Sequence, residues 1–175
     1  MTLNRALRLP NASAQVQANN RCRWNQTRSK AEADFYTIGY SGRQPNELLD
    51  ALVSVGICSV LDIRYSPVSL HRPEFSKGNL CRLLAQHGIE YQHQPLLGVP
   101  RDIRGLAVGA ATRDAIWHWY DRNVVAGYIG RNLNHFLNSV DHPVALLCVE
   151  ADPTACHRHR LCLALERLGL RSFDL

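Results

Sequence analysis

The segment of residues 148–158 carries the densest group of side chains that can do chemistry. It holds Cys148, Glu150, Cys156, His157 and Arg158, with an Asp-Pro turn in the middle. The apolar run before it predicts a buried strand, and the residues after it predict a helix that begins near Cys156. Free N–H groups at a helix start attract anions and lower the pKa of a nearby thiol. We therefore interpret Cys156 as a nucleophile and Glu150 as an acid or base. Arg158 and His157 are then ligand contacts, Arg158 because its guanidinium can hold phosphate or carboxylate through two hydrogen bonds.

The same segment also has a purely structural interpretation. Cys148 and Cys156 would then be small core residues, Glu150 would pair with Arg158, and His157 would pack inside the protein. We favour the functional interpretation because the polar groups cluster at one strand end.

A second candidate group is Asp62 and Arg64, near the end of an earlier apolar run. Side chains two positions apart lie on the same side of a strand. We interpret Asp62 as a second catalytic carboxylate and Arg64 as an anion-binding residue. The alternative is a structural ion pair.

The sequence predicts neither a metal nor a cofactor. The spacing of Cys148, Cys156, His157 and His159 matches no paired zinc-ligand pattern, and we expect the adjacent Cys156 and His157 to point in different directions. Residues 39–42 are too short for a dinucleotide-binding fingerprint.

An aromatic run contains Trp117, Trp119 and Tyr120 on a predicted helix. Trp117 and Tyr120 are one helical turn apart and can face the core, while Trp119 lies on another face. We favour packing in the core or in a lid, and base stacking is the alternative.

The elements that position these residues alternate along the chain. Strands are predicted at residues 35–38, 57–63, 89–93, 144–149 and 170–175, and helices at 45–55, 77–87, 112–123, 128–140 and 153–168, with a long loop at 95–109. This order predicts an α/β fold with a mainly parallel open sheet, helices on both faces and a single domain. We expect residues 57–63 and 144–149 to be neighbouring central strands.

Ligands of open parallel sheets bind beyond the carboxyl ends of the strands. Tyr40 and Ser41 directly follow the first predicted strand, so we include them among the ligand-binding residues.

Composition divides the chain into a tail and a domain. Residues 1–34 carry six basic and two acidic side chains, a net charge of +4 out of +5 for the whole chain. Residues 1–33 show no periodicity, so we predict a disordered basic tail before a single domain at 34–175. No apolar run is long enough to span a membrane, and no export signal begins the chain. We expect a cytoplasmic protein with free thiols.

Taken together, the motifs resemble the domain of unknown function 488 family. The resemblance covers roughly residues 36–175 and rests on Thr37-Ile38-Gly39-Tyr40-Ser41, Asp62-Ile63-Arg64 with Pro67 and Ser69, Phe75, the residues from Tyr91 to Gly98, Leu147-Cys148-x-Glu150 with Pro153, and Cys156-His157-Arg158. Two departures are Val99, where the family often has glycine, and the terminal Asp174-Leu175, where it often has His-Ile. The resemblance implies a cytosolic prokaryotic α/β domain and no settled activity.

The leading hypothesis is an enzyme, such as a hydrolase or transferase, that acts on a small anionic, nucleotide-like ligand. The alternative is a nucleic-acid-binding module that uses the basic tail and the tryptophan-rich helix. The sequence does not indicate an oligomeric state.

Overall fold

A computed structural model of the chain describes residues 33–105, 110–132 and 141–175. Its centre is a five-stranded sheet in the order β3-β2-β4-β1-β5, in which every neighbouring pair is parallel. The strands are β1 (Phe35–Gly39), β2 (Ser59–Asp62), β3 (Glu90–His93), β4 (Val144–Cys148) and β5 (Ser172–Asp174). The predicted α/β fold with an open parallel sheet is confirmed, and β2 and β4 are the neighbours expected from their continuous apolar runs.

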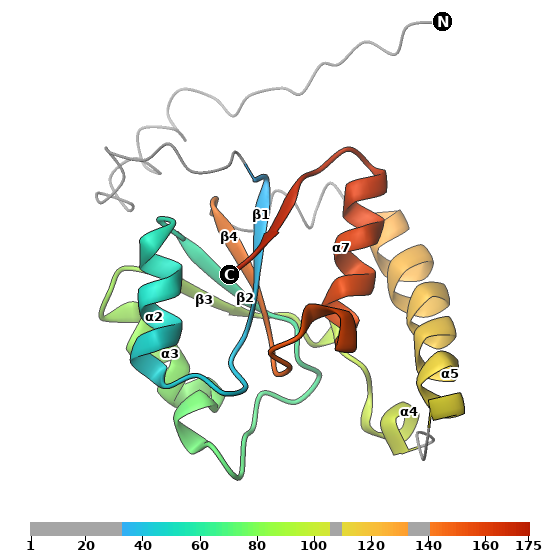
Figure 1. The fold of residues 1–175 in the computed structure, drawn as a ribbon, viewed down its shortest axis with the longest axis horizontal. Helices are drawn as coiled ribbons and strands as arrows, with labels where there is room; N and C mark the ends of the chain where they lie inside the picture. Colours follow the sequence, from blue (N-terminus) through green and yellow to red (C-terminus); the bar gives the residue numbers. More distant parts are fainter. Residues whose placement is uncertain (1–32, 106–109, 133–140) are drawn as a thin grey trace, which may run out of the picture.

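Helices cover both faces of this sheet (Figure 1). One face carries α2 (Pro45–Ser54) and α3 (Lys77–Ala85), and the other carries α5 (Ala110–Tyr120), the π-helix η3 (Asp121–Ile129) and α7 (His157–Arg167). Within the described residues, the remaining elements are the short helices η1 (Pro73–Phe75), η2 (Pro95–Leu97), α4 (Arg101–Gly105) and η4 (Pro153–Ala155).

Strand alternation divides the apolar interior into two cores. In β4, Val144, Leu146 and Cys148 face the core beneath α7, whereas Ala145 and Leu147 face the core beneath α2 and α3. All five residues are buried because side chains of successive strand residues point to opposite faces. Burial on both faces explains why this strand carries no polar alternation.

Helix boundaries follow local signals in most places. In α2, Pro45 occupies the first turn and Gln44 and Glu47 form a capping box. Gly56 follows the helix with φ +71°, a conformation that favours glycine.

Three segments differ from the sequence prediction. The predicted loop at 95–109 contains η2 and α4, because Pro95 and Pro100 each begin a helical turn. The predicted helix at 112–123 runs on into η3 without a break, and no proline interrupts it. The predicted helix at 153–168 is divided at Cys156, whose extended backbone separates η4 from α7.

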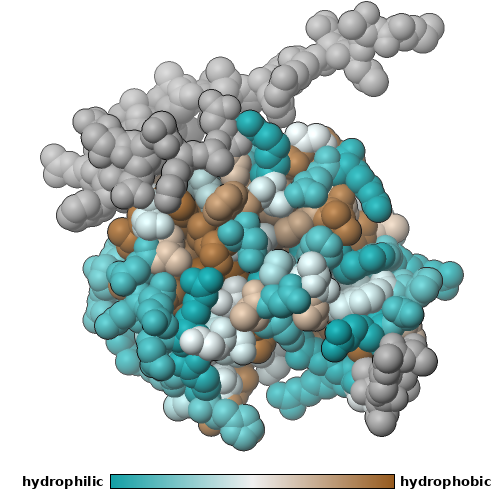
Figure 2. Space-filling view, viewed as in Figure 1, coloured by the Kyte–Doolittle hydropathy of each residue, from teal (hydrophilic) through white to brown (hydrophobic). Residues whose placement is uncertain are grey.

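Hydrophilic side chains dominate the face of the molecule shown in Figure 2, with apolar residues gathered in its middle and upper part. Among the exposed apolar residues is Phe173 on β5. This edge strand has only three residues, and such short edges limit pairing with other chains.

The structure tests only part of the expectations about the tail, membrane spans and the cysteines. The predicted disordered tail lies outside the described residues, except for Ala33. No helix of the described residues is long and apolar enough to cross a membrane. Cys81, Cys148, Cys156 and Cys162 are free thiols as expected, but Cys58 is disulfide-bonded, so that expectation is wrong at this position.

Candidate functional site

The loop that leaves β4 is held in place by a buried arginine. The Arg158 guanidinium donates to the backbone oxygens of Glu150 and Ala151, the latter at 2.9 Å, and forms an ion pair with Asp174 at 3.3 Å. Its side chain is completely buried. The structure therefore gives Arg158 partners within the protein, in the loop between β4 and α7 and on β5.

The end of β1 approaches the same loop closely. Gly39 pairs with Cys148 across the sheet, and a Cβ atom at Gly39 would collide with the Glu150 carbonyl oxygen and lie 2.9 Å from Nη1 of Arg158. Only glycine leaves room for this approach. Gly39 thereby fixes where the Glu150 backbone lies.

Cys156 occupies the N-cap of α7, as the sequence predicted. Asp152 accepts a hydrogen bond from the Thr154 N–H at 2.8 Å, which forms the turn before the helix. The Cys156 sulfur then accepts the Arg158 N–H at 3.5 Å. This bond satisfies one of the free N–H groups of the helix start.

Two thiols and an imidazole meet at the carboxyl end of β4. Nδ1 of His157 lies 3.8 Å from Sγ of Cys148 and 3.9 Å from Sγ of Cys156. Nε2 of the same ring lies 3.3 Å from the backbone oxygen of Ile63. All three side chains are buried. The expectation that Cys156 and His157 point in different directions is wrong, because the extended backbone of Cys156 turns both toward Cys148.

The thiols and the nearby carboxyl group influence one another's ionisation. The neighbouring Cys148 thiol, together with His157, lowers the pKa of Cys156 in spite of its burial. The nearby Cys156 thiol and burial raise the pKa of Cys148. Burial and the charge of Cys156 raise the pKa of Glu150, whose Oε2 atom accepts from Cys148 at 3.4 Å.

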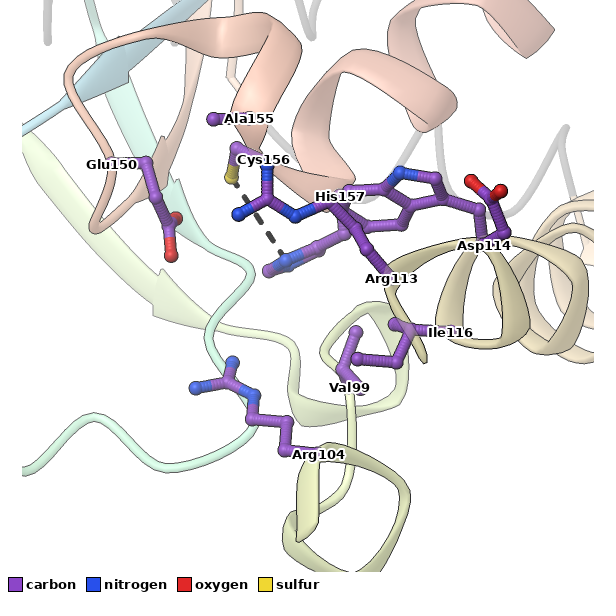
Figure 3. A pocket seen from close by; sticks show the side chains of 10 residues that line it. Val99, Arg104, Arg113, Asp114, Ile116, Glu150, Ala155, Cys156 and His157 are labelled. Carbon is purple, nitrogen blue, oxygen red and sulfur yellow. Dashed lines mark hydrogen bonds between the residues drawn. The ribbon is translucent and has the colours of Figure 1, made fainter. Parts of the chain in front are cut away.

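A cavity of about 670 Å³ opens above this cluster (Figure 3). Glu150, Cys156 and His157 form one part of its wall. On the far side, the wall includes Arg104 from the short helix α4, and Arg113, Asp114 and Trp117 from α5.

The sequence analysis missed Arg104 and Arg113. Both lie outside the strand ends, in or after the segment interpreted as a loop. A usable signal was the presence of several arginines in the connection that returns across the carboxyl edge of the sheet.

Asp62 and Arg64 form a separate buried network. Nε of Arg64 donates to Asp62 at 2.8 Å, Nη2 donates to the other carboxylate oxygen at 2.5 Å, and Tyr91 also donates to Asp62 at 2.7 Å. The Arg64 guanidinium lies 5.1 Å from the centre of the Tyr40 ring. Burial alone would lower the pKa of Arg64, but the hydrogen bond and charge of Asp62 outweigh it and raise this pKa.

The predicted site residues therefore fall into different places. The structure brings Glu150, Cys156 and His157 together in the cavity wall. It places Tyr40, Asp62 and Arg64 in the buried network, where the Tyr40 ring also stacks on Phe75 with centroids 4.5 Å apart. Arg158 braces the loop, and Ser41 is exposed with its N–H bonded to the Val149 oxygen at 2.8 Å.

The aromatic helix is shared between the cavity and the core. Trp117 lines the cavity, Trp119 packs against the core beneath α7, and Tyr120 is buried there with its hydroxyl donating to the Leu97 oxygen at 2.8 Å.

Fold and site define an α/β protein with an open parallel sheet and a polar cavity at the carboxyl edge. The chain belongs to the DUF488 family: the family model, described as "Domain of unknown function DUF488", matches residues 44–165, about 70% of the chain. This match spans Glu150, Cys156 and His157. Neither a curated protein nor a solved structure matches the chain.

Proposed function

We propose that this chain is an enzyme, of the hydrolase or transferase class, that acts on a small anionic ligand in the cavity at the carboxyl edge of the sheet. The observation that carries the proposal is the composition of the cavity wall. Two arginines, Arg104 and Arg113, share one cavity with Glu150, Cys156 and His157. The volume of about 670 Å³ falls within the range of small-molecule sites.

Arg104 and Arg113 bind the anion in this proposal. Arg104 reaches the cavity from α4 and Arg113 from the first half of α5, and both residues are exposed (Figure 3). A guanidinium can hold phosphate or carboxylate through two parallel hydrogen bonds. These two residues replace Arg64 and Arg158, whose guanidinium groups are buried and paired with Asp62 and Asp174, although Nη1 of Arg64 has no hydrogen-bond partner among the described residues.

Glu150 transfers the proton. Its carboxyl group is partly buried and borders both the cavity and Cys148, so it is in reach of a bound ligand and of the thiol cluster. Such a position suits general acid or base catalysis.

Asp62 and Arg64 have a positioning role in this proposal, in place of the proton-transfer and anion-binding roles expected from the sequence. Their network ties β2 to β3 through Tyr91, and His93 hydrogen bonds to the Arg64 backbone oxygen at 2.9 Å. The network thus supports β2. Ile63 directly follows this strand, and its backbone oxygen lies 3.3 Å from Nε2 of His157.

Isothermal titration calorimetry with pyrophosphate and AMP, against adenosine as the uncharged probe, tests the proposal. We expect the two anions to bind and adenosine not to bind. Arg113→Ala and Arg104→Ala should each weaken anion binding about tenfold or more, since each removes a charge-assisted hydrogen bond of about 1.5 to 3 kcal/mol. Arg82→Ala is the matched control, because Arg82 is an exposed arginine on α3 and does not line the cavity.

Two outcomes would overturn the proposal. One is an absence of binding by either anion. The other is binding that Arg82→Ala weakens as much as Arg113→Ala. A nucleic-acid-binding module would instead bind a single-stranded oligonucleotide with a steep salt dependence, lose it when residues 1–33 are deleted, and be unaffected by Arg113→Ala.

A further inference from the structure

The cluster of Cys148, Cys156 and His157 has the donor atoms of a metal site. The two sulfurs and a ring nitrogen all lie within 4.8 Å of one another. Thiolate and imidazole are the ligands that zinc prefers in proteins. We propose that this cluster binds one zinc ion, with Cys148, Cys156 and Nδ1 of His157 as its protein ligands.

The distances fit a tetrahedral ion. Bond lengths of about 2.3 Å to sulfur and about 2.0 Å to nitrogen place neighbouring sulfur and nitrogen ligands about 3.5 Å apart. In the structure Nδ1 lies 3.8 Å from Cys148 and 3.9 Å from Cys156. The same nitrogen is thus nearly equidistant from both sulfurs, and small side-chain movements close the site around an ion.

The surroundings of His157 match those of a metal-bound histidine. Its Nε2 atom faces the Ile63 backbone oxygen at 3.3 Å, and a carbonyl can only accept, so Nε2 carries the hydrogen. This leaves Nδ1 as the unprotonated nitrogen, 3.8 Å from Sγ of Cys148 and 3.9 Å from Sγ of Cys156. Because Nε2 also lies 3.8 Å from Sγ of Cys148, a rotation of the ring is needed to point the Nδ1 lone pair at an ion between the sulfurs. Metal-binding histidines almost always donate their second N–H to a carbonyl or carboxylate in this way.

Charge balance supports the same assignment. Two thiolates compensate the charge of a zinc ion, so the occupied cluster would be neutral in its buried surroundings. The nearby Arg158 is already paired with Asp174, and its backbone N–H donates to the Cys156 sulfur at 3.5 Å.

Three protein ligands leave a fourth position open. Cys156 and His157 line the cavity, and Glu150 borders it beside them (Figure 3). Three protein ligands with one open position are typical of catalytic rather than structural zinc. This role for the ion rests on the proposed function: a bound zinc ion would supply a polarised, acidified water in the cavity, and the Glu150 carboxylate beside it would accept the proton. Cys156 then acts as a ligand, not as the nucleophile that the sequence suggested.

The test uses the full chain, incubated with zinc, desalted and analysed for bound metal by mass spectrometry. Wild type should retain one zinc ion per chain. Cys148→Ser and His157→Asn should weaken zinc binding at least about tenfold. Cys162→Ser is the matched control: Cys162 is also a buried, free cysteine and lies on α7, but outside the cluster.

A second measurement avoids variants that fail to fold. Cobalt(II) added to the wild-type chain should give a thiolate-to-cobalt charge-transfer band and the visible spectrum of a tetrahedral ion, both removed by zinc. Absence of this spectrum, or zinc retained equally by all variants, overturns the proposal.

Failure of the zinc site and failure of the proposed function are distinguishable. Arg113→Ala should bind zinc as wild type does while losing anion binding. A chain that binds zinc but no anion would refute only the proposed function, and a chain that binds the anion but no zinc would refute only the metal site.

Discussion

Gly39 and Glu150 lie so close together that the end of β1 and the loop after β4 occupy adjoining positions with no room for a side chain between them. This contact joins two strands that are neighbours in the sheet but more than a hundred residues apart in the sequence. The position of the candidate proton-transfer residue therefore depends on a glycine in another strand.

Gly39→Ala should destabilise the fold by about 2 kcal/mol or more, because the added methyl group meets backbone rather than a flexible side chain. The measurement is urea unfolding followed by circular dichroism. Gly78→Ala is the control: Gly78 lies in α3 with open space around it, so alanine there should stabilise by about 0.5 to 1 kcal/mol. Equal effects of the two substitutions would contradict the close approach.

Asp62→Asn should destabilise the fold by about 3 to 5 kcal/mol, because it leaves the buried Arg64 charge without its partner. Replacing both residues, in Asp62→Leu with Arg64→Met, should cost less than the sum of the single changes. Chemical denaturation of Asp62→Asn, Asp62→Leu, Arg64→Met and the double variant checks this. A loss below about 1 kcal/mol for Asp62→Asn would show that the pair has no structural role.

Tyr91→Phe should show a pH-dependent loss of stability. Burial and the charge of Asp62 raise the pKa of Tyr91 in the folded state above the value of about 10 of an unfolded chain. The folded state thus favours the protonated phenol, and this contribution is fully present below pH 10 and declines as the pH rises above it.

At pH 8 wild type should be more stable than Tyr91→Phe by about 1 to 2 kcal/mol, because the Tyr91 hydroxyl donates a partly buried hydrogen bond to the charged Asp62. The difference should shrink between about pH 10 and 11. Urea titrations at pH 8, 9, 10 and 11 measure it, and a difference that stays constant would mean that Tyr91 does not donate to Asp62.

Arg158→Gln should cost about 3 to 5 kcal/mol, since it leaves two backbone oxygens without their charged donor and Asp174 without its ion-pair partner. Arg160→Gln, on the same helix, should cost less than about 1 kcal/mol because its ion pair with Asp121 is partly exposed. Thermal unfolding of both variants is the comparison. If Arg158→Gln were as mild as Arg160→Gln, the loop would not depend on this brace.

The sheet could be predicted because its central strands are buried on both faces and carry unbroken apolar runs. Strand alternation placed Asp62 and Arg64 on one side of the strand, but their ion pair was only the alternative to the catalytic and anion-binding roles that the sequence analysis favoured. The position of Cys156 followed from the Asp-Pro turn. In each case the deciding interaction is local in the sequence.

The rest of the site depends on contacts that no local pattern encodes. Arg104 and Arg113 reach the cavity only because α4 and α5 fold across the carboxyl edge of the sheet. The meeting of Cys148 with His157 depends on an extended backbone at Cys156 that divides what reads as one helix. Residue spacing alone could not show that the donor atoms of Cys148, Cys156 and His157 form one cluster.

The most direct test of the cavity as the site of an anionic ligand is a crystal structure of the full chain grown with pyrophosphate. The anion should lie in the cavity between Arg104 and Arg113, with oxygen-to-nitrogen distances of about 2.7 to 2.9 Å, and within reach of Glu150. Pyrophosphate bound elsewhere on the chain, with this cavity empty, would contradict the assignment.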